Sequence, residues 1–451
     1  MKDRFAFDVT CAPQTQFWNR PLVHRRLFFR HMASATGGFF LLPTLTTERL
    51  ARAAVSTKNT AKYCIFVMMR GGPSQIDTFD FKEGPWMPAS LRPASYGDIR
   101  WPQGLMPKLA EQLGSVALIR SMRSWAAVHV LAQSWVQIGR NPAAAASRIA
   151  PHIGSVVSME LSPPNAMLPA FVFLNSGSGI GAGYLPPKHN PFFMTPTGSA
   201  LANTRHPDGN ERFDRRYGLL LAMDAELRTS EPLGIETHAY NLAARTTMYN
   251  SALDEVFTFD ASERLRYGNT QFGNACLAAR NMIRGNTGVR FIQIDQGNWD
   301  QHDNIYAATN SHITLAKQFD DGLAALITDL KAGGLFDETL IVCLGEFGRT
   351  TGNLTATQGR DHLLQQAALV AGARVTGGKV IGSTNSAGSA TAEPGWARGR
   401  DIRAEDMEAT IYSAMGIDWT TVRLDDPLGR GFYYVPESDR DVYGPVDELW
   451  A

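Results

Sequence analysis

The chain has 451 residues, of which 44% are apolar and 19% are charged. This is a globular composition, and it excludes a disordered chain, a collagen, a coiled coil and a small disulfide scaffold. The 43 basic and 43 acidic residues balance, so the charge gives no indication of a nucleic-acid partner. At roughly 100–200 residues per domain, the length allows one large domain or two ordinary ones.

The N-terminal region has the features of an export signal. The pair Arg25-Arg26 precedes a moderately apolar segment, residues 32–45, and Ala51-Arg52-Ala53 follows as a small-x-small cleavage pattern. Together these features resemble a twin-arginine signal peptide. An ordinary amphipathic first helix is the alternative interpretation.

We therefore predict a signal peptide over residues 1–53 and one domain over residues 54–451. The twin-arginine export machinery would be a partner, and the mature protein would be periplasmic or secreted. No later stretch has the roughly 20 apolar residues that cross a bilayer, so no stable membrane span is expected after cleavage.

Short, nearly continuous apolar runs recur along the rest of the chain and predict buried strands of a parallel sheet. The first run, residues 62–69, stops at Gly71-Gly72-Pro73. The other runs span residues 116–119, 170–174, 290–295, 339–344 and 367–370. Two of these strands, and the segment near residue 276, carry cysteines, which we predict to be buried thiols (Cys64, Cys276 and Cys343).

Helices are predicted between and after the later strands. Apolar residues recur at helical spacing before Gly333, at Leu315, Phe319, Leu323, Leu326 and Leu330. Residues 405–415 predict a second helix. Strands that alternate with helices imply an α/β sheet covered on both faces. Residues 176–209 and 377–399 are rich in Gly, Pro and Asn, and are predicted to be loops or cap material over a sheet edge.

Polar residues cluster where the predicted strands end, which is where ligands bind in open α/β sheets. The segments are residues 71–80, 295–304, 345–350 and 359–362. Carboxylates and imidazoles that meet at one edge can hold a divalent cation such as Zn, Ca, Mg or Mn. Two arginines in these segments, Arg349 and Arg360, could bind a phosphate or sulfate group.

Each of these residues also has a structural interpretation. Asp77 can cap a turn, and Asp300 with His302 can be a hydrogen-bonded surface pair. Glu346 follows an apolar run and would be costly to bury without a partner, so Arg349 can be its counter-ion.

The same segments resemble the DUF1501 family, exported bacterial proteins of the alkaline phosphatase/sulfatase-like superfamily. The similarity rests on the ordered motifs Gly71–Lys82, Trp299–His302, Gly345–Thr350 and Gly359–His362, and it extends over roughly residues 60–420. It implies an alkaline phosphatase-like three-layer αβα sandwich with a mostly parallel central sheet. It also implies a site with one or two divalent metals and a Ser, Thr or formylglycine nucleophile.

The chain departs from the active members of that superfamily. Where those enzymes carry Asp-His after a strand, this chain has Glu346 and Phe347. The segment that is similar to the nucleophile region puts His129 at the reactive position, and no Cys-x-Pro-x-Arg motif is present.

Two functions follow from the resemblance. In the first, the protein is an exported metal-dependent hydrolase of small-molecule or glycan esters of phosphate or sulfate. The expected metal ligands are Asp300, His302, Glu346, Asp361 and His362. The expected attacking or proton-moving group is His129, Ser74 or a metal-bound water. Arg349 would be catalytic by stabilising the developing anionic charge, and Arg349 with Arg360 would bind the anionic group. In the second, the fold binds a surface glycan or an envelope partner without catalysis. Metal content and turnover of aryl esters would distinguish them.

Overall fold

The computed structural model describes residues 55–201 and 204–451. The predicted signal peptide, with its arginine pair and cleavage pattern, lies outside these residues. From Val55 onward the described residues form one compact unit.

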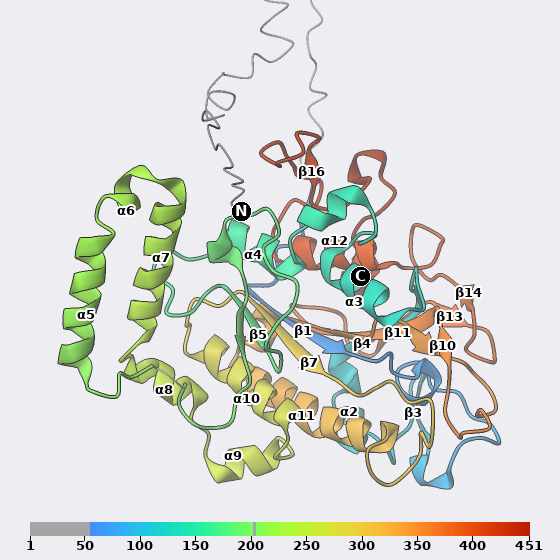
Figure 1. Ribbon diagram of the computed structural model, residues 1–451. Helices are drawn as coiled ribbons and strands as arrows, with labels where there is room; N and C mark the ends of the chain where they lie inside the picture. Colours follow the sequence, from blue (N-terminus) through green and yellow to red (C-terminus); the bar gives the residue numbers. More distant parts are fainter. Residues whose placement is uncertain (1–54, 202–203) are drawn as a thin grey trace, which may run out of the picture. The chain divides into compact units, whose positions relative to one another are not determined.

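An eight-stranded sheet forms the centre of this unit, in the order β12-β4-β11-β8-β1-β7-β5-β6 (Figure 1). Its strands are β1 (Tyr63–Met69), β4 (Val116–Arg123), β5 (Phe171–Leu174), β6 (Phe192–Met194), β7 (Phe291–Gln296), β8 (Thr339–Leu344), β11 (Gln365–Gly372) and β12 (Lys379–Ile381). Four two-stranded sheets accompany it: β2 (Ala94–Tyr96) with β3 (Ile99–Trp101), β9 (Gly348–Arg349) with β10 (His362–Leu363), β13 (Ser383–Thr384) with β14 (Thr391–Glu393), and β15 (Val422–Arg423) with β16 (Phe432–Tyr433).

The helices are α2 (Pro107–Ala110), α3 (His129–Ile138), α4 (Ile153–Leu161), α5 (Asn210–Met223), α6 (Leu227–Ser230), α7 (Pro232–Thr247), α8 (Ser251–Phe257), α9 (Ala261–Arg266), α10 (Gln271–Arg284), α11 (His312–Ala332) and α12 (Ala404–Ala414). Both helices predicted from the sequence are present, as α11 and α12. None of the helices in the described residues is long and apolar enough to cross a membrane.

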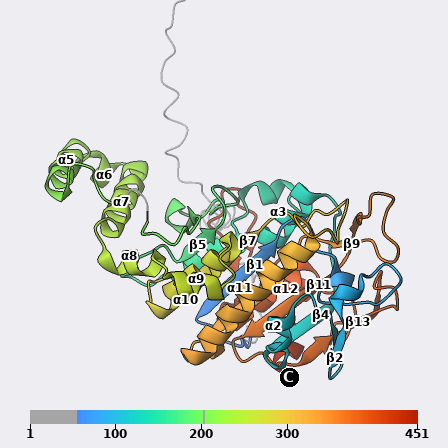
Figure 2. The same cartoon turned by 90° about the horizontal axis from the view of Figure 1, so that it is seen from below.

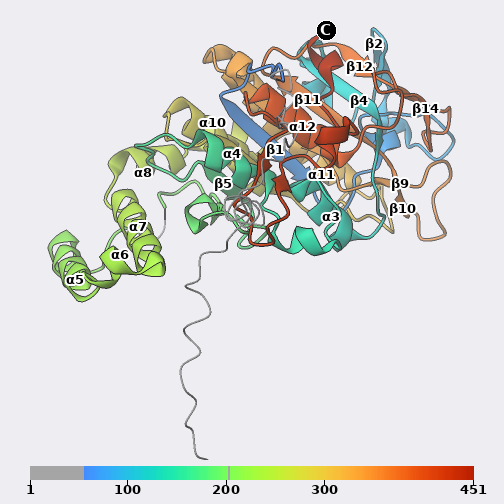
Figure 3. The same cartoon turned by 90° about the horizontal axis from the view of Figure 1, so that it is seen from above.

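Helices cover both faces of the sheet, and successive side chains of β1 pack alternately against one helix layer and the other. Its odd-numbered residues, such as Ile65, belong to the apolar core formed with α10 and α11. Its even-numbered residues, such as Phe66, belong to the core formed with α3, α4 and α12. Figure 2 shows the first helix layer in front of the sheet and Figure 3 the second. The predicted three-layer α/β architecture is therefore confirmed.

One strand of the sheet runs against the others. β1 pairs in parallel with β7 and β8, whereas β11 is antiparallel to both of its neighbours, β8 and β4. The remaining pairs, β5 with β6 and β7 and β4 with β12, are parallel. The prediction that residues 367–370 form a parallel strand was wrong, because an apolar run reports burial and not direction.

The two segments predicted as loops supply both edge strands of the sheet. β6 comes from residues 176–209, and β12 comes from residues 377–399. Each of these strands has only three residues, which is too short for a periodic apolar signal. The cysteines Cys64, Cys276 and Cys343 are buried and unbridged, as predicted.

Candidate metal centre

Polar segments from five strands meet at one edge of the central sheet. The carboxyl ends of β1, β4, β7 and β8 lie there because these strands are parallel. Since β11 is antiparallel, its amino end lies at the same edge, which brings in the preceding segment with His362. α3 begins at His129 shortly after β4. The reversed strand is therefore what allows His362 to join residues that follow the parallel strands.

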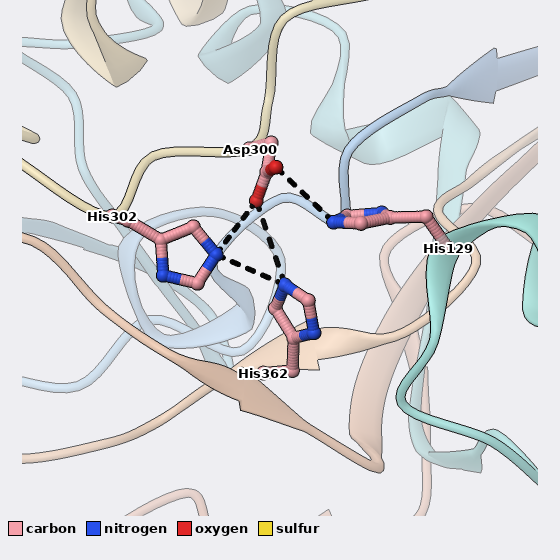
Figure 4. A group of neighbouring side chains, drawn as sticks. All are labelled: His129, Asp300, His302 and His362. Atoms are coloured by element: carbon pink, nitrogen blue, oxygen red, sulfur yellow. Dashed lines mark hydrogen bonds and ion pairs between the residues drawn. The ribbon is translucent and has the colours of Figure 1, made fainter.

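Four side chains form a cluster at this edge: His129, Asp300, His302 and His362 (Figure 4). One ligand atom from each lies within 4.8 Å of the others. Asp300 is central. Its Oδ1 lies 3.0 Å from Nε2 of His302 and 3.5 Å from Nε2 of His362, and its Oδ2 lies 3.2 Å from Nε2 of His129.

Each histidine of the cluster makes a hydrogen bond at Nδ1 that fixes the orientation of its ring. His129 bonds Oε1 of Glu346 at 2.8 Å, and His302 bonds Oδ1 of Asp361 at 3.0 Å. His362 bonds the backbone oxygen of Ala127 at 2.8 Å. Carboxylate and carbonyl oxygens only accept hydrogen bonds, so each Nδ1 must carry the proton. When these rings are neutral, the three Nε2 atoms that face Asp300 carry lone pairs and can serve as metal ligands.

This arrangement fits a bound cation. The Nε2 atoms of His302 and His362 lie 3.0 Å apart, and in neutral rings protonated at Nδ1 their two lone pairs would face each other. Neighbouring ligand atoms around a tetrahedral zinc ion are roughly 3.3 Å apart, given Zn–N bonds of about 2.0–2.1 Å. The four closest contacts in the cluster run from 3.0 to 3.5 Å, and all its ligand atoms lie within 4.8 Å of one another. Histidines held through Nδ1 by carboxylates or carbonyls are the usual surroundings of such a metal.

Arg349 lies against the cluster and is itself completely buried. Its Nη2 lies 2.5 Å from Oδ1 of Asp300, and its Nη1 lies 3.2 Å from Nε2 of His302. The guanidinium also bonds the backbone oxygens of Gly71, Gly72 and Arg360. Burial raises the pKa of Asp300, but the hydrogen bond and charge of Arg349 outweigh it and lower that pKa to about 2.

Glu346 is completely buried behind His129. Its Oε1 accepts hydrogen bonds from the backbone of Gly71 at 2.8 Å, from Gln133 at 3.0 Å and from His129. The hydrogen bond to Glu346 raises the pKa of His129, against the opposing effect of burial. Arg349, predicted as the possible counter-ion of Glu346, instead pairs with Asp300.

Two of the predicted site residues lie in a separate buried network. Ser74 donates to Oδ2 of Asp77 at 2.6 Å, and Arg360 bonds the same oxygen at 2.9 Å. Tyr306 donates to the other oxygen of Asp77 at 2.5 Å. All the members except Tyr306 are buried, so this network joins the loop after β1 to the segment before β10.

Two glycines allow the loops of the site to approach each other. Gly71 has a φ of +113°, and a Cβ there would collide with the backbone nitrogen of Asp300. A Cβ at Gly359 would collide with the backbone carbonyl of His302. Any larger residue at these positions would push the Asp300–His302 loop away from the sheet edge.

A pocket of about 330 Å³ opens beside the cluster. It shares His129 and Asp300 with the cluster, and its other lining residues are Arg70, Gly71, Gln133, Asn175, Asp295, Gly297 and Asn298. Substrate-sized molecules would therefore reach the cluster at these two shared side chains.

The structure thus brings together three of the predicted ligands, Asp300, His302 and His362. The other two, Glu346 and Asp361, are hydrogen-bonded to His129 and His302, respectively. The sequence interpretation placed His129 at the reactive position but not among the ligands. Two further residues, Arg70 and Gln133, were missed, and Asp295 was placed in a polar segment but given no role. Arg70 directly follows a predicted strand, and Asp295 ends another. Their position at strand ends could have identified them as candidate site residues.

Comparison with known proteins gives the following relationships. No curated protein matches the chain. Solved structures with weak overall similarity include a sulfatase from Pseudoalteromonas sp. (13% identity, 80% of this chain and 68% of that one, TM-score 0.40) and a phosphonate monoester hydrolase from Silicibacter pomeroyi (11%, 79% and 74%, TM-score 0.38). A protein in the alkaline phosphatase superfamily from Vibrio parahaemolyticus is similar at 12% identity (80% and 69%, TM-score 0.40).

The family match covers most of the chain. The model of the family described as "Protein of unknown function (DUF1501)" matches residues 61–439. This interval includes every side chain of the cluster and every partner that orients it. The chain therefore belongs to the DUF1501 family, as its motifs predicted.

Proposed function

We propose that this protein is a metal-dependent hydrolase of phosphate or sulfate esters, with His129, Asp300, His302 and His362 as its metal ligands. One observation carries the proposal. Three histidines, each with Nδ1 occupied by an acceptor, direct Nε2 toward one carboxylate. A bound cation would satisfy the lone pairs of these Nε2 atoms, two of which lie 3.0 Å apart.

The ligand set favours zinc, with manganese as the next choice. Three imidazole nitrogens and one carboxylate oxygen are typical zinc donors, whereas Ca and Mg prefer sites built only from oxygen. Of the four metals considered from the sequence (Zn, Ca, Mg and Mn), the proposal thus keeps Zn and Mn. When bound, such an ion polarises an ester oxygen and lowers the pKa of a coordinated water.

The surrounding residues would position the ligands and the substrate. Glu346 would hold the ring of His129 through the proton on Nδ1, so that Nε2 is directed toward the metal. Arg349 would hold Asp300 and keep it ionised, since it lowers the pKa of that carboxyl. Substrate would enter from the pocket that His129 and Asp300 border.

This proposal changes several roles expected from the sequence. His129 becomes a ligand instead of the nucleophile, and Glu346 and Asp361 orient ligands instead of binding the metal. Arg349 and Arg360 have buried guanidiniums that are bonded to protein groups, so neither is available to an incoming anion. Ser74 is buried and bonded to Asp77, which leaves it no access to substrate.

A binding protein without catalysis remains the second candidate, and one observation favours it. The guanidinium of Arg349 already supplies a positive charge to Asp300 and a hydrogen bond to His302. In this alternative, Arg349 takes the place of a metal, and the edge of the sheet binds a glycan or an envelope partner.

Metal content and turnover test the proposal together. The purified chain should contain about one zinc or manganese ion and should hydrolyse aryl phosphate or aryl sulfate esters. His362→Ala should lose both properties, while His206→Ala, which changes a histidine outside the cluster, should keep both. Absence of metal after incubation with each ion would contradict the proposal and favour the binding protein.

We also propose export by the twin-arginine route. The support is the Arg25-Arg26 pair with its apolar segment and cleavage pattern. Replacing both arginines by lysine should retain the protein in the cytoplasm of a bacterial host, whereas the unchanged chain should reach the periplasm. Equal export of both would contradict this route.

A further inference from the structure

The pocket beside the cluster contains one arginine, Arg70, which directly follows β1. Its side chain is 42% exposed, in contrast with 1% for Arg349 and 0% for Arg360. Of these three arginines, Arg70 is therefore the one that a solute can reach. Its position at the carboxyl end of a central parallel strand is the usual position of a ligand-binding group.

Arg70 is held in place by two neighbouring side chains. Its Nη1 lies 2.9 Å from Oδ2 of Asp295, and its Nη2 donates to Oε1 of Gln133 at 2.9 Å. Asp295 is in turn fixed by Gln293, which donates to its other oxygen at 2.8 Å. A guanidinium has five N–H donors, so these two bonds leave three donors without a partner among the described residues.

The same glutamine connects Arg70 to the metal cluster. Gln133 donates to Glu346 at 3.0 Å while it accepts from Arg70. Glu346 in turn holds His129, which borders the pocket. One chain of hydrogen bonds therefore sets the position of the arginine relative to a proposed ligand, and this arrangement is preorganised before any substrate arrives.

We infer that Arg70 binds the anionic group of the substrate. Its free N–H donors contact non-bridging oxygens of a phosphate or sulfate ester whose remaining oxygens face His129 and Asp300. This inference rests on the proposed function and assigns the anion-binding role that the sequence analysis gave to Arg349 and Arg360. Arginine suits the role because its planar fork matches the oxygens of a tetrahedral anion.

A purely structural role for Arg70 predicts a different outcome. If Arg70 only neutralises the buried Asp295, its removal lowers stability and leaves anion affinity unchanged. If it binds the anion, removal weakens anion binding in the folded protein. Asp295 and Asp300 both border the pocket, so without Arg70 the remaining charged side chains repel an anion.

The test uses the full chain loaded with metal. Binding of inorganic phosphate and of inorganic sulfate is measured by calorimetry for the unchanged protein, Arg70→Gln and Arg70→Lys. The matched control is Arg100→Gln, since Arg100 is 38% exposed, is paired with one carboxylate, Glu83, and lies outside the pocket. Thermal unfolding and metal content are recorded for each variant.

Arg70→Gln is expected to weaken binding of at least one anion roughly ten-fold or more, because a charge-assisted hydrogen bond is lost. Arg70→Lys should recover part of the loss, and Arg100→Gln should match the unchanged protein. The two anions tell which ester class the pocket prefers. In turnover assays the loss should appear in kcat/KM.

Two results would overturn the assignment: equal affinity of Arg70→Gln and the unchanged protein, or no anion binding by unchanged protein that holds its metal. In the second case the metal centre stands and only Arg70 fails. If no metal binds, the proposed function fails, and the same comparison on the metal-free chain decides the role of Arg70.

Discussion

Glu346, which is buried, and His129, which is partly exposed, form a carboxylate–imidazole pair, with Oε1 of the first 2.8 Å from Nδ1 of the second. The other ring nitrogen of His129, Nε2, lies 3.2 Å from Oδ2 of Asp300, so the pair is in direct contact with the rest of the cluster. Glu346 has no exposed surface, and the described hydrogen bonds of its carboxylate are all made through Oε1. A buried carboxylate that fixes a histidine in one tautomer is expected to affect metal binding more than folding.

Glu346→Gln should reduce metal affinity by roughly 10- to 100-fold while the protein stays folded. The amide oxygen can keep the three hydrogen bonds of Oε1, but the negative charge that makes His129 a stronger ligand is lost. Competition with a chelator gives the affinity, and Glu338→Gln, on the exposed surface, is the control. Unchanged affinity would show that Glu346 does not orient a ligand.

Asp361→Asn should have a smaller effect than Glu346→Gln. Both carboxylates accept from Nδ1 of a clustered histidine, but the side chain of Asp361 is 65% exposed. Water screens its charge and can replace its hydrogen bond to His302. The same chelator competition ranks the metal affinities of the two variants. A larger loss of metal affinity in Asp361→Asn than in Glu346→Gln would contradict the arrangement described for the cluster.

Metal binding should weaken as the pH falls. The hydrogen bond from His129 to Glu346 raises the pKa of His129, so in the metal-free protein protonation of this ring stabilises the fold. That contribution is complete below the unfolded value of about 6.5 and is lost as the pH rises through the higher folded value. A metal needs the neutral ring, so its contribution has the opposite dependence on pH.

The increase in Tm on adding zinc should therefore be large at about pH 8 and small at about pH 5. Asp300 does not contribute to this change, because its pKa is about 2 and it stays ionised throughout. Thermal unfolding with and without zinc across this range provides the measurement. A zinc effect that is constant over the range would exclude imidazole ligands.

Gly71→Ala should abolish metal binding and destabilise the protein. The added Cβ would overlap the backbone of Asp300 at a φ of +113°, so the loop that carries Asp300 and His302 must move. Gly297→Ala is the matched control, since a Cβ there would have no neighbour within 4 Å. Its metal affinity and Tm should be close to those of the unchanged chain, and equal behaviour of both variants would refute the steric argument.

Ser74→Ala should keep ester turnover and lose about 1 kcal/mol of unfolding free energy. Ser74 donates to buried Asp77, so its hydroxyl supports the loop after β1 and does not reach the pocket. Urea unfolding and kcat measured on the same preparation separate the two effects. A folded variant without turnover would restore Ser74 as a catalytic residue.

Much of the fold follows from local patterns in the sequence. Continuous apolar runs predicted β1, β7 and β8 to within a residue or so, because a strand buried on both faces must be apolar throughout. The helical spacing of apolar residues predicted α11 in the same way. The export signal, likewise read from local features, stays a prediction.

The site was predictable in its position but not in its assignment of roles. That Asp300, His302 and His362 follow or precede strands indicated a common edge. Whether a carboxylate contacts a metal or only the ring behind it depends on distances of a few ångströms, which no spacing in the sequence encodes. Glu346 and Asp361 were for that reason expected to be ligands, whereas we propose that they orient the histidines.

By itself, therefore, the sequence determined which segments are buried and which polar residues stand at their ends, because burial and periodicity are local properties. The tertiary structure decided the direction of β11, and with it the arrival of His362 beside Asp300. It also decided that Arg360 is enclosed while Arg70 faces the pocket. Strand order and loop contacts join residues far apart in the chain, and their free energies become available only when the whole sheet assembles.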